Sequence, residues 1–370
     1  MPNPARIEIS GLGLAGACLL RALALSRYAG RVAVYERAAA PAQGASGNPL
    51  GIVHPLRSAD HNLSSQFFDL GLLTCIDWCR NLGAEAQGWA GFCGVHEDGR
   101  PEAGGWIVPT TFVQACLDDA RAWFGSRLSL HFGTAAPQRL AAPQAQTAPL
   151  GQDAHSGLGE PQTVRVACSA HPGSLQEAGL CLLPVAGQVS WVEAQPEEGP
   201  RQVLCGAGYV APVVRGRLLV GASFDRETEE ALVTAEGHAE NFERLSQLDA
   251  DLAARMRPRW ADAQGRASVR WATRDRLPLI GQPADLLALE QHPHPQRISQ
   301  LHQLPRLAHQ FVLMGLGARG LTTAPLGALA VAAQILGQPA VMPDRLAEAV
   351  DPARFVLRTH RRKGPWPEAH

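Results

Sequence analysis

The chain has 370 residues, of which 46% are hydrophobic and 18% charged, and its formal net charge is −1. This length and apolar content predict a large buried core divided between two domains. The near-neutral charge excludes a protein whose whole surface is basic enough to hold nucleic acid or an anionic membrane.

The cysteines and the hydropathy pattern predict a cytoplasmic protein without membrane contacts. None of the eight cysteines forms a C-x-x-C pair, the spacing expected of a redox or zinc site. The first residues lack the apolar core of a signal peptide, and no apolar run is long enough to span a bilayer. We therefore expect reduced cysteines.

The first part of the chain has the pattern of a βαβ unit. Residues 6–10 alternate like a short strand, and residues 15–28 have the apolar pattern of a helix. Residues 31–37 are rich in β-branched residues and predict the second strand.

The turn inside this unit has a dinucleotide-binding pattern, Gly11-x-Gly13-x-x-Gly16, and Glu36 follows 20 residues after Gly16. Gly11 permits the tight turn, and Gly13 lets the backbone approach a pyrophosphate held at the helix N-terminus. An acidic residue at the end of the second strand accepts ribose hydroxyls and argues against a 2′-phosphate. The pattern predicts NAD or FAD and does not separate them.

The middle of the chain alternates between strand and helix patterns. A helix is predicted within residues 58–83, and a strand followed by a helix within 104–124. Strand patterns follow at 163–170, 180–194 and 215–224, and an amphipathic helix at 229–249.

Two stretches are predicted to be irregular. Residues 133–164 are rich in Ala, Pro, Gln and Gly without periodicity, which predicts a flexible insert. Residues 282–304 contain His292, His294 and His302 in a proline-broken polar loop, and we expect no metal site there.

A second glycine-rich turn lies about 300 residues after the first, with Gly315, Gly317 and Gly320 before an apolar helix predicted to begin around Thr322–Pro325. A simple NAD dehydrogenase has no evident need for it. A flavin ring that gains negative charge on reduction is stabilised by the N–H groups of a helix N-terminus. The alternative is a tight connection into a C-terminal core helix.

Several motifs occur in the order seen in the D-amino-acid oxidase/glycine oxidase family of flavoenzymes, which the chain resembles. They include "GLGLAG", "GYVAPVVRGRLLVGASF", "SVRWATRDRLPLIG" and "MGLGARGLTTAP". Within that family, "APAQGASGNPLGIVHPLRSADHN", "PVAGQVS" and "DPARFVLR" are similar to the C-terminal oxidoreductase half of bifunctional tRNA 5-methylaminomethyl-2-thiouridine biosynthesis proteins. This resemblance extends over residues 6–358.

The resemblance implies an α/β fold in which a Rossmann-type FAD-binding domain is interleaved with an α+β substrate domain that carries a mainly antiparallel sheet. The implied boundaries are 1–85, 160–185 and 260–350 for the FAD-binding domain, 86–132 and 186–259 for the substrate domain, and 351–370 for a C-terminal tail. FAD is expected to be non-covalent, because no cysteine follows Cys205. The implied FAD-binding residues are Gly11, Gly13, Gly16, Glu36, Ala45, Ser46, Gly47, Gly315, Gly317, Ala318, Arg319, Gly320 and Leu321.

The resemblance also implies a reaction. The family oxidatively removes the carboxymethyl group of 5-carboxymethylaminomethyluridine at the tRNA wobble position, which releases glyoxylate, with molecular oxygen as the expected electron acceptor. Arg270 and Tyr209 would clamp the substrate carboxylate, and Arg319 would lie beside the flavin. An arginine fork matches a carboxylate in two places. The methyltransferase half of the bifunctional proteins is not expected, so methylation would need a separate protein.

Other interpretations remain open at this stage. Arg270 and Arg274 could be structural ion-pair partners of Asp275. The enzyme could instead oxidise free glycine, sarcosine or D-amino acids, or the chain could bind flavin or RNA without turnover. A basic cluster near the C-terminus is a candidate phosphate-binding patch or a solvated end, comprising Arg354, Arg358, Arg361, Arg362 and Lys363.

Overall fold

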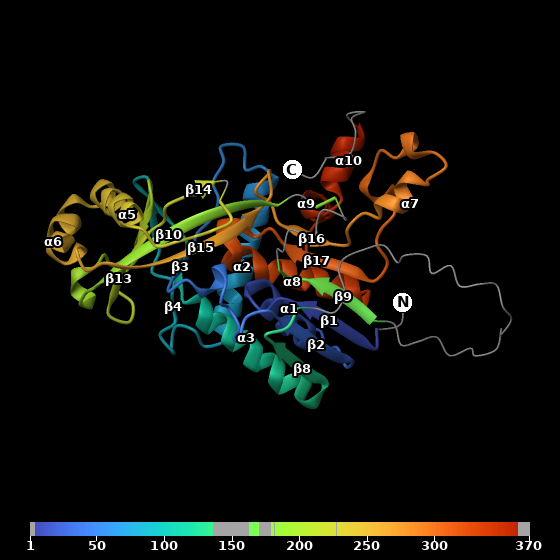
Figure 1. Ribbon diagram of the computed structural model, residues 1–370, viewed down its shortest axis with the longest axis horizontal. Coiled ribbons are helices and arrows are strands. Elements are labelled where there is room, and N and C mark those ends of the chain that lie inside the picture. Colours follow the sequence, from blue (N-terminus) through green and yellow to red (C-terminus); the bar gives the residue numbers. More distant parts are fainter. Residues whose placement is uncertain (1–3, 136–162, 170–178, 181, 227, 362–370) are drawn as a thin grey trace.

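The structure is a computed structural model that describes residues 4–135, 163–169, 179–180, 182–226 and 228–361. These residues form two large sheets, one small sheet and the helices around them (Figure 1). Residues 136–162 of the expected insert lie outside the described residues.

The first large sheet has six strands in the order β16-β17-β9-β1-β2-β8. Its five neighbouring strands from β17 to β8 are parallel, and β16 is antiparallel to β17. Apolar residues of the central strands, such as Ile7, Ile9 and Val34, are buried, because helices cover a parallel sheet. The strand bounds are β16 Leu279–Gly281, β17 Gln310–Met314, β9 Thr163–Ala167, β1 Arg6–Ser10, β2 Arg31–Glu36 and β8 Leu128–Phe132.

Four helices pack side by side in the order α3-α1-α8-α2, and α1 and α8 contact the six-stranded sheet. The central two, α1 and α8, are buried over most of their length, which explains why their sequences are apolar nearly all round. The bounds are α1 Leu14–Leu25, α2 Leu63–Asn81, α3 Pro109–Phe124 and α8 Gly320–Leu336.

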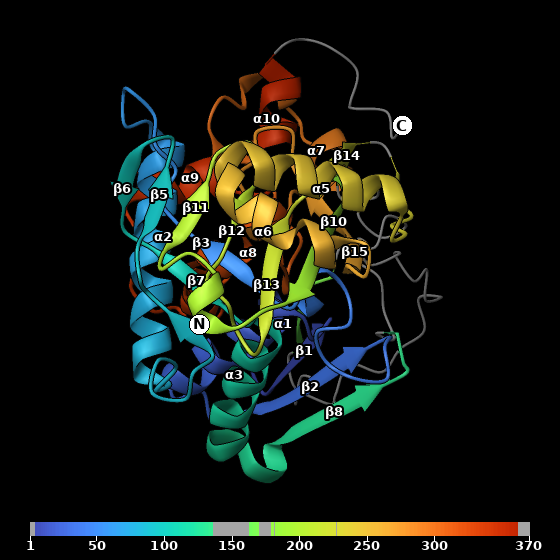
Figure 2. The ribbon, with the colours of Figure 1, turned by 90° about the vertical axis from the view of Figure 1, so that its left-hand side faces the viewer.

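The second large sheet has eight strands and is mainly antiparallel. Its long strands β10 and β15 pair along their whole shared length and reach from the far end of the molecule toward the six-stranded sheet (Figure 1). Helices α5 and α6 pack on one another and on this sheet (Figure 2). The strand bounds are β5 Val95–Glu97, β6 Arg100–Glu102, β10 Leu183–Glu193, β11 Val203–Cys205, β12 Tyr209–Val210, β13 Arg217–Gly221, β14 Asp225–Arg226 and β15 Gln264–Ala272.

The remaining elements connect these layers. A three-stranded sheet has the order β3-β7-β4, and β5 and β6 of the eight-stranded sheet lie between β4 and β7 in the chain. The remaining bounds are β3 Gly51–Val53, β4 Ala90–Gly91, β7 Gly105–Ile107, α5 Ala235–Leu248, α6 Ala250–Trp260, α7 Leu286–Glu290, α9 Asp344–Val350 and α10 Arg354–Arg361.

The predicted α/β architecture, a parallel nucleotide-binding sheet joined to a mainly antiparallel one, is confirmed. The sheet positions differ from the expected domain limits. Strand β8 lies in the six-stranded sheet and α3 packs on α1, although 86–132 was expected in the substrate domain. Strand β15 lies in the eight-stranded sheet, although 260–350 was expected in the FAD-binding domain. Strand pairing between distant segments decides both assignments.

Several predicted elements have shifted ends. The helix predicted over 229–249 begins at Ala235, because the Thr234 side chain caps it by accepting from the Gly237 N–H at 3.0 Å. The loop predicted over 282–304 contains α7 and two short 3₁₀ turns. The tail predicted from 351 begins with α10, which packs on α9.

Candidate functional site

The first glycine turn joins β1 to α1. The N-cap residue of α1 is a glycine, so it has no side chain that could cap the helix. Gly11 has a φ of +99°, a conformation that side chains with a Cβ rarely adopt. Gly13 is that N-cap residue, and the Leu14 N–H donates a hydrogen bond to the Ser46 hydroxyl oxygen at 3.0 Å. No acidic residue lies in the first turn of α1. Its amide groups are therefore arranged to favour an anion.

Glu36 closes the turn from the next strand. Its carboxylate accepts the Leu12 N–H at 2.7 Å and the Ala38 N–H at 2.9 Å. Each carboxylate oxygen has a further lone pair, and Glu36 lines the cavity described below. The side chain can therefore hold the turn and also accept ribose hydroxyls.

The second glycine turn follows β17. Gly315 and Gly317 have φ values of +68° and +55°, and a 3₁₀ turn leads directly into α8 at Gly320. The helix therefore begins earlier than predicted, and Pro325 lies in its second turn instead of its first. No acidic residue lies in the first turn of α8, whose N-terminus also favours negative charge.

A single cavity of about 970 Å³ joins the two glycine turns. Its size is in the range of cofactor sites. Most of the predicted site residues line it, although they come from opposite ends of the chain. These are Gly11, Gly13, Glu36, Ala45, Ser46, Tyr209, Arg270, Gly315, Gly317, Ala318, Arg319, Gly320 and Leu321.

Two predicted cofactor residues do not line the cavity. A Cβ on Gly16 would overlap the Gly11 carbonyl oxygen, so Gly16 allows α1 to pack close under the turn. A Cβ on Gly47 would overlap the Arg266 guanidinium and lie 2.6 Å from the Ala42 carbonyl oxygen. Both glycines shape the backbone behind the cavity.

Arg270 projects from β15 into the cavity, and its Nη2 atom is buried without a hydrogen-bond partner among the described residues. Its guanidinium lies 4.7 Å from the centre of the Phe224 ring. A buried, unpaired guanidinium is costly unless an anion satisfies it. The alternative interpretation, a structural ion pair with Asp275, is not formed by either Arg270 or Arg274.

Tyr209 lines the same cavity from β12. Burial raises the pKa of Tyr209 to about 12, although the nearby charge of Arg270 opposes the shift. The phenol therefore keeps its proton over the physiological range and can donate a hydrogen bond beside Arg270.

Arg319 is tied to the loop after β3. Its Nη1 donates to the His54 carbonyl oxygen at 2.9 Å, and its guanidinium lies 5.3 Å from the centre of the Phe68 ring. Arg319 also lines the cavity at the start of α8. It therefore fixes the position of His54 relative to the second glycine turn.

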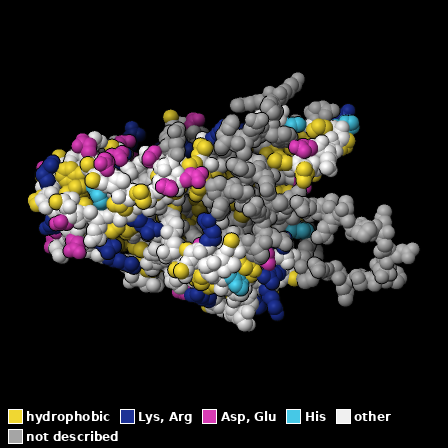
Figure 3. Space-filling model, viewed as in Figure 1, with side chains coloured by type: hydrophobic (Ala, Val, Ile, Leu, Met, Phe, Trp, Pro, Cys, Tyr) yellow, Lys and Arg dark blue, Asp and Glu magenta, His cyan; other side chains and the backbone are white. Residues whose placement is uncertain are grey.

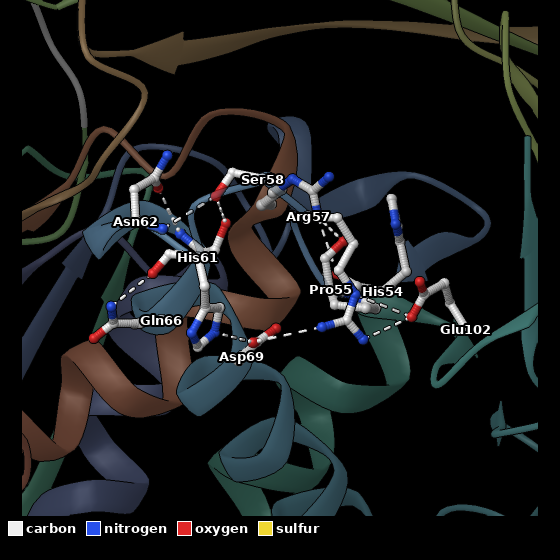
Figure 4. A network of polar contacts seen from close by, with 11 residues as sticks. His54, Pro55, Arg57, Ser58, His61, Asn62, Gln66, Asp69 and Glu102 are labelled. Carbon is white, nitrogen blue, oxygen red and sulfur yellow. Dashed lines mark hydrogen bonds and ion pairs between the residues drawn. The ribbon is translucent and has the colours of Figure 1, made fainter. Parts of the chain in front are cut away.

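The loop after β3 holds a polar network that the sequence did not predict (Figure 4). Arg57 reaches Glu102 at 2.7 Å and Asp69 at 3.8 Å, and His61 contacts Asp69 at 3.0 Å. Glu102 is 45 residues from Arg57, whereas Asp69 is eight residues from His61, in the helix that follows the loop. Only the cluster of charges in "HPLRSADHN" could have hinted at them.

His54 lies at the cavity end of this loop, with its Nδ1 atom 3.3 Å from Glu97 Oε2. Burial and the charge of Arg319 lower the pKa of His54 to about 4. Burial also raises the pKa of Glu97. The imidazole is therefore neutral at the pH of the cell.

The predicted basic patch is corrected in part. Arg354 is only 3% exposed and is paired with Asp275, so it is not available to a phosphate. Arg358 also contacts Asp275, and Arg361 donates to the Ser299 carbonyl oxygen. Arg362 and Lys363 lie outside the described residues.

The site has the donors and shape that FAD requires. Two helix N-termini without acidic residues face one cavity, a carboxylate lies at the ribose position of the βαβ unit, and glycines replace side chains where the backbone must approach. A Cβ on Gly13 would lie 2.8 Å from Ser46 Oγ and would fill this approach. Among the described residues, no group of three or more potential metal ligands is found, and no helix is long and apolar enough to cross a membrane.

Comparison with known proteins agrees with this geometry. The sequence profile of the family described as DAO, FAD dependent oxidoreductase, matches residues 102–334. A tRNA 5-methylaminomethyl-2-thiouridine biosynthesis bifunctional protein MnmC from Burkholderia multivorans is 31% identical and matches 97% of this chain and 61% of its own length. The MnmC of Burkholderia lata is 32% identical and matches 96% of this chain and 61% of its own length. The chain thus spans about three fifths of the length of these relatives.

Solved structures share the fold at low sequence identity. Glycine oxidase from Geobacillus kaustophilus has a TM-score of 0.62 and 19% identity, with 92% of this chain and 97% of that one covered. L-Proline dehydrogenase from P. horikoshii has a TM-score of 0.64 and 13% identity, with 96% and 99% covered.

Proposed function

The chain belongs to the DAO family of FAD-dependent oxidoreductases, and from this premise we propose that it oxidises a secondary amine of the form N–CH₂–COO⁻. The proposed substrate is the 5-carboxymethylaminomethyl group of a modified wobble uridine in tRNA, in line with the tRNA-modifying relatives. The proposed products are the aminomethyl nucleoside and glyoxylate, with molecular oxygen as the final electron acceptor.

The observation that carries this proposal is the Arg270 guanidinium, which lines the cavity that joins the two glycine turns and forms no ion pair among the described residues. A carboxylate on the substrate would satisfy it through a charge-assisted pair. The Tyr209 hydroxyl, which stays protonated, would donate to the same carboxylate.

The chain's own residues bind and orient both partners in the proposed reaction. The first glycine turn and Glu36 would hold the adenosine and pyrophosphate end of non-covalently bound FAD, and the second turn would hold the ring end. Arg270 and Tyr209 would fix the carboxylate. The position of the neighbouring CH₂ group would then follow from the position of the carboxylate. Positioning of this kind supplies much of the rate enhancement.

FAD, when bound, supplies the two-electron acceptor that converts the N–CH₂–COO⁻ group to an imine, which water hydrolyses to the aminomethyl group and glyoxylate. The amine must arrive without its extra proton. His54 lines the same cavity, and its backbone carbonyl accepts a hydrogen bond from Arg319. Because its imidazole is neutral, His54 adds no positive charge to the cavity.

The test is anaerobic mixing of the FAD-loaded protein with tRNA that carries 5-carboxymethylaminomethyluridine. Loss of the oxidised flavin absorbance and release of glyoxylate are expected. Free glycine and sarcosine should produce neither. Bleaching by the small amino acids but not by tRNA would assign the protein to free amino-acid oxidation instead, and bleaching by none of them would leave a flavin-binding protein without this turnover.

Arg270→Ala separates anchoring from folding. Loss of a charge-assisted contact to the carboxylate should lower kcat/KM about 10- to 100-fold while the variant keeps its flavin. The matched control is Arg31→Ala. Arg31 is the first residue of β2, and this variant should behave as the wild type. If Arg270→Ala loses FAD, the residue is structural.

A further inference from the structure

The turn at residues 273–277, between β15 and β16, presents two exposed arginines beside the cavity. Arg274 and Arg276 are both exposed, and neither forms an ion pair among the described residues. We propose that these two guanidinium groups bind phosphates of the RNA strand that carries the substrate nucleotide. This inference rests on the proposed function and names the surface that holds its macromolecular substrate.

The turn is held rigidly from within. The Thr273 hydroxyl contacts Asp275 Oδ1 at 3.0 Å and the Leu277 carbonyl oxygen at 2.6 Å. The Leu277 N–H donates to Asp275 Oδ1 at 3.3 Å. The backbone that carries Arg274 and Arg276 is therefore ordered before any ligand binds, which lowers the entropic cost of binding.

The only acidic side chain of the turn is already neutralised. Asp275 is bound by Arg354 at 2.8 Å and by Arg358 at 2.7 Å. The four arginines and one aspartate together carry a net charge of +3, because four positive charges minus one negative charge leave three. Since Asp275 is engaged by Arg354 and Arg358, it forms no ion pair with Arg274 or Arg276, and the turn keeps an excess of positive charge.

The turn also lies beside the reacting end of the cavity. Arg274 follows Arg270 by four residues, so at most about 14 Å of extended chain separates their Cα atoms. Ala272 forms a bridge with Leu316, and a Cβ on Gly315 would lie 3.2 Å from Thr273 Cγ2. The turn thus packs on the second glycine turn, which lines the cavity.

The backbone at Arg276 guides the choice of substitution. Its φ is +63°, in the left-handed region where glycine or asparagine is usual. Arg27 and Arg215 adopt the same conformation, with φ values of +57° and +51°, so the backbone alone does not mark a binding site.

Charges of both signs lie at the far end of the molecule, on the face shown in Figure 3. Helix α5 contains Glu236, Glu240 and Glu243, and α6, which packs on it, carries three exposed arginines. The turn at residues 273–277 differs, because its two exposed arginines accompany one aspartate that is already paired.

The experiment compares the full-length FAD-loaded protein with Arg274→Ala/Arg276→Gly. Glycine suits the left-handed backbone at position 276 and removes the charge without strain. The Kd for substrate tRNA should rise about tenfold or more, and the slope of log Kd against log salt concentration should fall by about 1.5 to 2, as for the loss of two phosphate contacts. Oxidation of the free carboxymethylaminomethyl nucleoside should keep its kcat and KM.

Two further variants serve as controls. Arg274→Lys/Arg276→Lys keeps both charges and should retain most of the affinity, since a phosphate accepts a lysine as a point charge. Arg31→Ala/Arg80→Ala removes two other exposed arginines and should leave the salt slope unchanged.

The possible results separate the two proposals. If the wild type oxidises neither tRNA nor the free nucleoside, the proposed function fails. If the wild type oxidises tRNA but the Arg274/Arg276 variant keeps its Kd and salt slope, this inference fails alone. An equal effect of the Arg31/Arg80 variant would also overturn it, because the contribution would then be general charge.

Discussion

Arg354 grips the carboxylate of Asp275 at two points: its Nε donates to Oδ2 at 3.0 Å and its Nη2 donates to Oδ1 at 2.8 Å. The same guanidinium donates to the carbonyl oxygens of Leu277, Pro278 and Asp351. One buried side chain of α10 therefore fastens the C-terminal helix to the turn after β15.

Arg354→Ala should lower the free energy of unfolding by about 3 kcal/mol, because it leaves a partly buried carboxylate and three carbonyl groups with fewer partners. Arg358→Ala removes the exposed partner of the same carboxylate and should lower it by less than about 1 kcal/mol. Urea denaturation of the two variants measures both values. Equal losses would contradict the assigned difference in burial.

Asp275 should make stability fall in acid. Burial raises the pKa of this carboxyl, but hydrogen bonds and charges of Arg354 and Arg358 outweigh burial and hold its pKa at about 2, below the ordinary 3.8. The stabilisation is therefore complete above about pH 5 and is lost as the pH falls toward 2. Its size is about 2 kcal/mol, and Asp275→Asn should remove this pH dependence in urea titrations. An unchanged acid profile in the variant would exclude Asp275 as its source.

His54 should produce a second, separate pH dependence. Its pKa is about 4 in the folded protein against an ordinary 6.5, so between these values the unfolded chain binds the proton and the folded chain does not. Stability should therefore rise with pH from 4 to 6.5, by up to about 3 kcal/mol. His54→Gln should flatten this rise, while the wild type and the variant should show the same slope above about pH 7. A rise that persists in the variant would assign it to other groups.

Gly13→Ala should weaken FAD binding by about tenfold or more, because the new Cβ would lie 2.8 Å from Ser46 Oγ at the point where the backbone approaches the cofactor. Gly206→Ala, outside the cavity, places its Cβ 3.2 Å from the flexible end of Leu248 and should retain FAD. The flavin-to-protein absorbance ratio after gel filtration measures the difference. Full flavin content in Gly13→Ala would show that this turn does not hold the cofactor.

Tyr209→Phe should raise KM for the proposed substrate about tenfold and leave the flavin content unchanged, because it removes one hydrogen bond to the carboxylate. Tyr28→Phe is the matched control, since the Tyr28 hydroxyl donates to the Pro4 carbonyl oxygen in the core. It should alter stability but not KM. Steady-state kinetics with the free nucleoside distinguishes the two, and an unchanged KM in Tyr209→Phe would remove that residue from the substrate clamp.

The sequence by itself determined the first glycine turn and the strands around it. Gly11 and Glu36 act through local backbone geometry and through the pairing of β1 with β2, which lie close in the chain. The motif order also identified the family, which the profile match confirms. Local patterns of this kind can be recognised in a sequence because the conformation of each residue depends on residues close to it in the chain.

Only the tertiary structure decided which distant charges meet. Asp275 pairs with Arg354 and Arg358, and not with the nearer Arg270 or Arg274, because α10 folds back onto the turn after β15. Composition and spacing carry no signal for such a contact, since it depends on how separate elements pack. The same packing buries Arg354, leaves Arg274 exposed, and brings the Arg270 side chain to the wall of the cavity.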